Sequence, residues 1–251
     1  MTTRHSQPAP AARPAPPTGA CAQPAAGSPS AAGKPRRGRC AGLPVVCCAA
    51  LLCALLGAPL AAAESAGAAA DEGAYARGEE ALLRGDVVGA LQAFRGPAQR
   101  GHAASQVQLA EILDAAEDDA AALDWYRRAA DAGHAEGAYG VGKMYASGEG
   151  VARDAATALD WFERASRGGS DRALSVLVSA HAAGQLGLTA DPARARALLE
   201  SAVDGGSAWA ARRLARAHAD GQLGLPVDAG AAQRWRERAA TLDAVNRAGE
   251  E

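Results

Sequence analysis

Aromatic residues are scarce in this chain, and cysteine is missing from most of it. Phe, Trp and Tyr make up only 4% of the 251 residues. All five cysteines precede residue 64. Disulfides therefore cannot hold residues 64–251 together, even in a compartment that permits them. The stability of that part has to come from packing, with the few aromatic side chains, Trp and Tyr above all, as the expected anchors.

Acidic residues are absent from the front of the chain. Residues 1–42 are rich in Ala, Pro, Arg and Gly and show no hydrophobic period, which predicts a disordered leader. All 28 acidic residues lie after residue 63, whereas six of the 26 basic ones lie before it, so residues 64–251 carry a net charge of about −8. Nucleic-acid binding needs a basic surface, and this balance argues against it.

An export signal follows the leader. A basic cluster precedes an apolar run from Leu43 to about Gly57, and small residues end at Ala63. This order is typical of a secretory signal peptide, so residues 43–63 are predicted to be its apolar region, with cleavage near Ala63 and a periplasmic or secreted product. The alternative is an uncleaved inner-membrane anchor, because the uncharged stretch 41–63 is long enough to span a bilayer. In both cases the residues that follow lie outside the cytoplasm, because the basic cluster stays inside.

Strand-like alternation is also missing, and a long repeat takes its place. The aspartates that open the second half of each unit recur at intervals of 32, 36, 37 and 37 residues: Asp86, Asp118, Asp154, Asp191 and Asp228. The glycines that close the units follow the same period: Gly101, Gly133, Gly169 and Gly206. Self-similarity with a period of 20–50 residues indicates a repeat architecture.

Each repeat is predicted to be a pair of helices. The aspartate is an N-cap for an Ala-rich helix, here called helix B, and the closing glycine is a left-handed C-cap. A preceding helix A ends on its own glycine, as over 137–148, 173–184 and 211–221. One such hairpin cannot bury its apolar stripe alone, so successive hairpins are expected to stack. Pro97 falls inside a predicted helix B and is expected to kink or shorten it.

The third unit carries a specific resemblance. Read from Ala138, it has the pattern A-x-x-x-G-x-x-Y-x-x-G-x-G-V-x-x-D, then A-x-x-W-F and A-x-x-x-G, which resembles a Sel1-like repeat, a relative of the tetratricopeptide repeat. The matching residues are Ala138, Gly142, Tyr145, Gly148, Gly150, Val151, Asp154, Ala158, Trp161, Phe162, Ala165 and Gly169. The resemblance extends to the fourth and fifth units, is weaker over about 103–133, and is weakest over about 72–101. It implies an all-α, right-handed α-solenoid of about five antiparallel helix pairs over 64–243, with a frayed tail over 244–251.

No catalytic, cofactor or metal site is predicted. The stretch Gly137–Met144 approaches a phosphate-binding loop, but Met144 stands where that loop needs Ser or Thr. His181 and His218 lie a full repeat apart, too far for shared metal ligation. The arginines of the last unit favour either a polar cap on the solenoid or a face that binds anions or carboxylates.

The signal segment predicts export, and the resemblance implies a protein-binding role. Together they predict an exported, non-catalytic scaffold or regulator of the bacterial envelope that binds another protein, an envelope sensor or an assembly component, on its concave helix-A face. The residues expected there are Tyr139, Lys143, Ser175, Ser179, Arg212 and Arg216. Two alternatives remain. One is a secreted β-lactamase-like hydrolase, although residues 64–251 lack both cysteines and the S-x-x-K motif. The other is an envelope-anchored structural protein.

Overall fold

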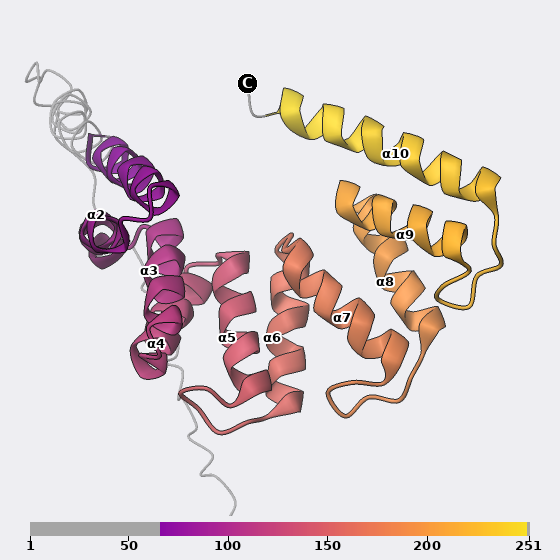
Figure 1. Cartoon of the computed structure of the whole chain (residues 1–251), viewed down its shortest axis with the longest axis horizontal. Coiled ribbons are helices and arrows are strands. Elements are labelled where there is room, and N and C mark those ends of the chain that lie inside the picture. Colours follow the sequence, from indigo (N-terminus) through magenta and orange to yellow (C-terminus); the bar gives the residue numbers. More distant parts are fainter. Residues whose placement is uncertain (1–65, 250–251) are drawn as a thin grey trace, which may run out of the picture. The chain divides into compact units, whose positions relative to one another are not determined.

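The computed structural model describes residues 66–249, in which every regular element is an α-helix. The first helix covers 66–83. It is followed by α2 (Val87–Arg100), α3 (Ala103–Ala115), α4 (Asp119–Asp131), α5 (Ala135–Ser147), α6 (Ala155–Arg167), α7 (Asp171–Ala183), α8 (Pro192–Asp204), α9 (Ala208–Asp220) and α10 (Ala229–Ala248). The helices form five successive pairs that lie side by side in chain order (Figure 1). The expected all-α solenoid is confirmed, while the predicted leader and signal segment fall outside the described residues.

The repeated aspartates begin the B helices, as expected. Each accepts a hydrogen bond from a backbone N–H of the first turn, satisfying one of the donors that a helix start leaves unpaired. Asp154 accepts from the backbone N–H groups of Ala156 at 3.0 Å and Thr157 at 3.2 Å, and from the Thr157 hydroxyl at 2.7 Å. The closing glycines adopt positive φ, from 86° at Gly133 to 100° at Gly101. The register read from these two landmarks is therefore confirmed.

Neighbouring A helices are joined directly. α3 contacts α5, and α5 contacts α7, in addition to the contacts of each with its own B helix. The N-cap hydroxyl of Ser170 donates to Glu136 at 2.6 Å, and that of Ser207 donates to Asp171 at 2.7 Å. Each of these bonds links the start of one A helix to the start of the preceding A helix. Stacking therefore combines apolar burial with hydrogen bonds that recur from unit to unit.

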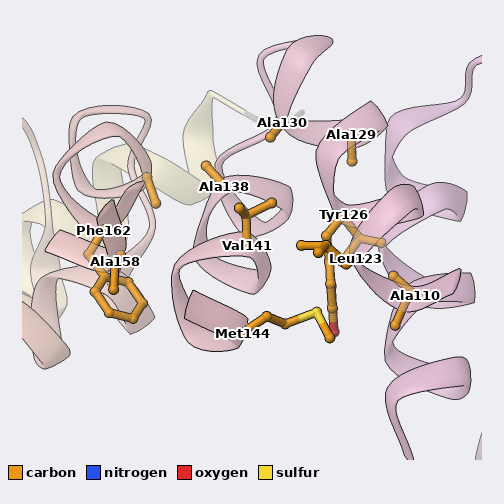
Figure 2. Packing of buried hydrophobic residues seen from close by; sticks show 14 of the residues in the cluster. Ala110, Leu123, Tyr126, Ala129, Ala130, Ala138, Val141, Met144, Ala158 and Phe162 are labelled. Carbon is orange, nitrogen blue, oxygen red and sulfur yellow. The ribbon is translucent and has the colours of Figure 1, made fainter. Parts of the chain in front are cut away.

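The core runs along the stack between A and B helices. In its central part, Val141 and Met144 of α5 point toward Leu123 and Tyr126 of α4 (Figure 2). The fully or nearly fully buried aromatic residues are Phe94, Tyr126 and Phe162. Here the structure corrects the expectation from sequence, because Trp125 and Trp161 are only partly buried at the edge of the core. Trp161 instead lies under the Arg164 guanidinium at 4.9 Å, a cation–π contact.

Small residues let α4 and α5 approach closely. A Cβ atom at Gly137 would lie 2.6 Å from the Ala129 Cβ and 2.7 Å from the backbone nitrogen of Ala130. A Cβ at Gly142 would lie 2.8 Å from the ring of Phe162. The glycines that resemble a phosphate-binding loop in sequence are thus packing positions inside α5.

Two helices extend further than the sequence predicted. Pro97 is buried inside α2, yet that helix is not shortened and continues to Arg100. The frayed tail expected from residue 244 is also wrong as far as Ala248, because α10 runs to that residue. Leu242 is buried, and the Asn246 side chain donates to the Gly206 carbonyl at 3.4 Å. The Asn246 contact holds the last turns of α10 against the loop between α8 and α9.

Candidate protein-binding surface

The six residues proposed from sequence occupy equivalent places on successive A helices. Each helix contributes its fifth and ninth residues, in the order Tyr139, Lys143, Ser175, Ser179, Arg212 and Arg216. Because α5 contacts α7 and the units follow one another in order, these positions form one row, which we call the helix-A face. The structure brings the six residues into one row, but it gives them very different surroundings.

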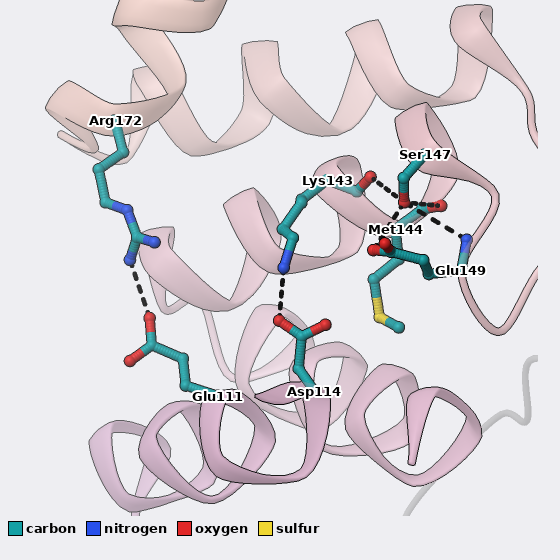
Figure 3. A network of polar contacts seen from close by, with 7 residues as sticks. All are labelled: Glu111, Asp114, Lys143, Met144, Ser147, Glu149 and Arg172. Carbon is teal, nitrogen blue, oxygen red and sulfur yellow. Dashed lines mark hydrogen bonds and ion pairs between the residues drawn. The ribbon is translucent and has the colours of Figure 1, made fainter. Parts of the chain in front are cut away.

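Lys143 is already held by a neighbouring unit. Its ammonium group donates to the Asp114 carboxylate of α3 at 2.5 Å (Figure 3). Partial burial works against the charged form of Lys143, but the hydrogen bond and the charge of Asp114 outweigh it and raise the pKa of the lysine. The carboxylate is only 14% exposed, so this pair is better shielded from water than a surface ion pair.

Tyr139 is covered by an arginine from the following unit. The Arg172 guanidinium of α7 lies 4.4 Å from the centre of the tyrosine ring. The same guanidinium bonds to Glu111 of α3 at 2.9 Å and to Glu136 of α5 at 3.3 Å. Figure 3 shows the Arg172–Glu111 contact, which joins residues 61 positions apart. Arg172 therefore ties three consecutive units together across the helix-A face.

The two positions that α7 contributes to the helix-A face are uncharged. Ser175 is half-buried and Ser179 is exposed. Neither side chain makes a hydrogen bond within residues 66–249. Between the ion-paired units on one side and the arginines of α9 on the other, α7 contributes an uncharged stretch to the face.

The last unit forms a basic hollow. Arg212 bonds to both carboxylate oxygens of Asp243 on α10, at 2.7 and 3.0 Å. Arg216 lies 3.4 Å from Asp220 at the end of its own helix. Arg236 of α10 completes a cleft of about 450 Å³ that these arginines share with small residues, Ala215 and Ala219.

A larger cleft is also lined by Arg212. Its volume is about 620 Å³, and Trp209, Leu174 and Leu198 give it an apolar part. Polar and charged residues make up much of the remaining lining: Ser166, Arg167, Ser170, Asp171, Ser201, Ser207, Arg212, Asp243 and Asn246. Arg212 lines both hollows, so they adjoin one another on α9.

The sequence of these units matches one family model. Four Sel1 repeats are found, at residues 104–134, 135–170, 173–207 and 210–243, which together cover more than half of the chain. The chain belongs to the Sel1 repeat family. The first helix pair lies outside the match, in agreement with its weak resemblance in sequence. The Sel1 repeat fold is typical of protein–protein interaction scaffolds.

Two solved structures are similar to this Sel1 repeat protein. One is a Sel1 repeat protein from Oxalobacter formigenes, 30% identical, with a TM-score of 0.49 over 61% of this chain and 45% of the other. The second is c5321, a protective antigen present in uropathogenic Escherichia coli strains and displaying an SLR fold. It is 25% identical, with a TM-score of 0.52 over 71% of this chain and 39% of c5321. The chain thus spans less than half the length of each protein. None of the curated proteins matches it.

Several residues of this surface were not predicted as site residues from sequence: Glu111, Asp114, Arg172, Trp209 and Asp243. Each acquires its place through a partner at least 29 residues away or on another helix, and no local pattern signals such a contact. The Sel1 repeat register alone could have found Glu111, because it occupies the ninth position of α3.

The histidines have structural places in the Sel1 repeats. The His181 and His218 carbonyls accept hydrogen bonds from the backbone N–H groups of Asp191 and Asp228, which closes the loop between the two helices of each unit. Within residues 66–249, no group of three or more His, Cys, Asp or Glu side chains is arranged to hold a metal ion. In the same range, no helix combines the length and the apolar character needed to cross a bilayer.

Proposed function

We propose that this Sel1 repeat protein is an exported, non-catalytic scaffold or regulator of the bacterial envelope that binds a partner protein through its helix-A face. One observation carries the proposal: the proposed residues are the fifth and ninth residues of three consecutive A helices, and these helices are linked in order by the α5–α7 contact and by the Ser207–Asp171 hydrogen bond between α9 and α7. A row of this kind offers an extended surface, which is how stacked repeats bind other chains. The basic cluster and apolar run before residue 64 support export.

The ion pairs of the face support binding by a prepared surface. Arg172 and Lys143 bridge between units and hold Tyr139, Glu111 and Asp114 in place before any partner arrives. Side chains that are already ordered lose less conformational entropy when a complex forms. Ser175 and Ser179 of α7 are uncharged and make no hydrogen bond within residues 66–249, so their side chains are free for direct contact with a partner.

Site-specific photo-crosslinking in intact cells tests this proposal. A crosslinking amino acid is placed at Ser179, which is exposed on the helix-A face, and in a matched variant at Glu163, which is exposed on α6. We expect Ser179 to capture a discrete partner from the envelope fraction and Glu163 not to. Capture of the same protein with equal yield at both positions, or at neither, would contradict binding through the helix-A face.

Export is tested separately, by mass spectrometry of the protein recovered from the periplasm or medium. We expect an N-terminus near Glu64. Recovery of a species that retains Cys47 and Cys48 from the membrane fraction would instead support the anchored alternative.

A further inference from the structure

Three arginines of the last unit line one cleft together with a single acidic residue. Arg212 and Arg216 are one turn apart on α9, and Arg236 lines the same cleft from α10. Asp220 is the single acidic residue in that lining, and the Arg216 side chain remains 74% exposed. Arg236 makes no ion pair within the described range, 66–249. Like charges gathered in this way repel one another, so the cleft favours the approach of an anion.

The equivalent positions of the preceding units lack this property. In α5 the lysine at the ninth position is neutralised by Asp114, and in α7 both positions are serines. The basic hollow is therefore a local feature of one end of the helix-A face and not a general property of the repeats.

The contact between Arg212 and Asp243 shows that a carboxylate group fits against the guanidinium groups of this hollow. Arg212 holds both oxygens of an aspartate side chain at 2.7 and 3.0 Å. Guanidinium groups bind carboxylates with favourable geometry and charge. Arg216 and Arg236 line the same hollow as Arg212 and offer further guanidinium groups, and the small alanine side chains leave the hollow open.

The neighbouring cleft has an apolar part, so a ligand that fills both clefts needs an apolar group as well as negative charge. Trp209, Leu174 and Leu198 line the larger cleft, which shares Arg212 with the basic hollow. A chain segment that runs along α9 would meet an apolar surface first and the arginines next. Both clefts are open to a single extended segment because they share Arg212 as their boundary.

We propose that these two clefts bind an acidic segment of the partner protein, with an apolar side chain against Trp209 and carboxylates on Arg216 and Arg236. This inference rests on the proposed function and specifies the chemistry of its partner. Charge complementarity selects the occupant: three guanidinium groups line the cleft around Arg216, and although Arg212 pairs with Asp243 and Arg216 with Asp220, Arg236 has no ion pair within residues 66–249 and Arg216 stays largely exposed, so a segment rich in Asp or Glu balances the remaining positive charge.

Fluorescence anisotropy with synthetic peptides tests the inference on the full-length protein. The probe is a fluorescein-labelled peptide with one leucine followed by several glutamates, and its control replaces each glutamate by glutamine. We expect the glutamate peptide to bind and the glutamine peptide to bind at least about tenfold more weakly. Binding should weaken as salt is raised, because exposed charges are screened.

Charge removal locates the site. The double variant Arg216→Gln/Arg236→Gln should weaken binding of the glutamate peptide by about tenfold or more, and Trp209→Ala should weaken it without changing the salt dependence. Arg194→Gln is the matched control, because Arg194 is exposed on α8 and makes no ion pair within residues 66–249. Circular dichroism checks that each variant is folded. Equal binding by the double variant and the Arg194 control, or equal affinity for both peptides, overturns the inference.

Two further outcomes are distinguishable. If Ser179 captures a partner while the glutamate peptide fails to bind, the helix-A face still binds a protein and only the acidic chemistry is wrong. If the peptide fails and sedimentation shows that Arg216→Gln/Arg236→Gln abolishes self-association of the free protein, the occupant is a second copy of this chain, and the inference is again wrong. Peptide binding that depends on both arginines supports it whether or not the crosslink is found.

Discussion

Gly137 lies where α5 packs on the last turns of α4, and Gly137→Ala tests whether close helix approach stabilises the array. Alanine in place of glycine favours a helix by at most about 1 kcal/mol in the absence of other contacts. Here the added methyl group would lie 2.6 Å from the Ala129 Cβ and 2.7 Å from the backbone nitrogen of Ala130. A backbone atom cannot rotate aside, so α4 and α5 would have to separate.

The net effect follows from two opposed terms. Forcing an extra methyl group into a packed interface costs about 1–3 kcal/mol, and the backbone contact favours the upper part of that range. After subtraction of the helix-propensity gain, we expect Gly137→Ala to lower the free energy of unfolding by about 1–2 kcal/mol. For a protein of this size that corresponds to a Tm lower by roughly 2–8 °C.

Thermal unfolding followed by circular dichroism measures the effect, with Gly73→Ala as the matched control. Gly73 also lies inside a helix, but a Cβ there would meet only the mobile end of Arg77, at 3.7 Å. Gly73→Ala should therefore leave Tm unchanged or raise it. Gly142→Ala should fall between the two, because its nearest contact is a side chain, the buried Phe162 ring at 2.8 Å, whereas the nearest backbone atom, the Ala158 oxygen, lies farther away at 3.3 Å. A Tm for Gly137→Ala that is equal to or above that of Gly73→Ala would refute this account of the α4–α5 contact.

Three other perturbations give measurable outcomes. Glu117 has a φ of 61°, a backbone conformation that favours glycine, and the equivalent residue of the first unit is Gly85. Glu117→Gly should therefore raise the free energy of unfolding, measured in urea, by about 0.5–1 kcal/mol. A decrease would contradict the backbone strain assigned to Glu117. Phe162→Ala should lower the free energy of unfolding by about 3–5 kcal/mol and broaden the thermal transition. Trp161→Ala should lower it markedly less, because Trp161 is only partly buried whereas Phe162 is almost completely buried. Equal losses in the two variants would contradict this ranking. Hydrogen bonds from the Thr157 hydroxyl and backbone lower the pKa of Asp154 below 3.8, so its contribution to stability is present above that value and is lost as the pH falls through the folded-state pKa. Urea titrations between pH 6 and 2 should therefore show a flatter acid limb for Asp154→Ala than for the natural protein, and an unchanged limb would exclude this carboxylate as a source of acid sensitivity.

Local chemistry accounts for the part of the fold that the sequence predicted. An aspartate at a helix start and a glycine beyond a helix end act through hydrogen bonds and φ angles within a few residues, so their positions can be read without a structure. Asp154 and Gly133 do in the structure what their places in the repeat indicated. Their period then fixes the number of hairpins and their stacking, and it places Lys143, Ser179 and Arg216 on equivalent positions of successive A helices.

Long-range packing decided what the sequence left open. Phe162 rather than Trp161 fills the core because the glycines of α5 leave space at that point, and this depends on how two helices cross. Arg172 meets Glu111 across 61 residues, a pairing set by the geometry of three stacked units.

The same division applies to the candidate site. The repeat pattern identified the helix-A face, because residues at a fixed position in each unit recur on the same side of the stack. Only the tertiary structure showed that Lys143 is neutralised by Asp114 while Arg216 and Arg236 converge on an open hollow. The physical reason is that charge pairing depends on distances between helices, which a sequence period does not contain.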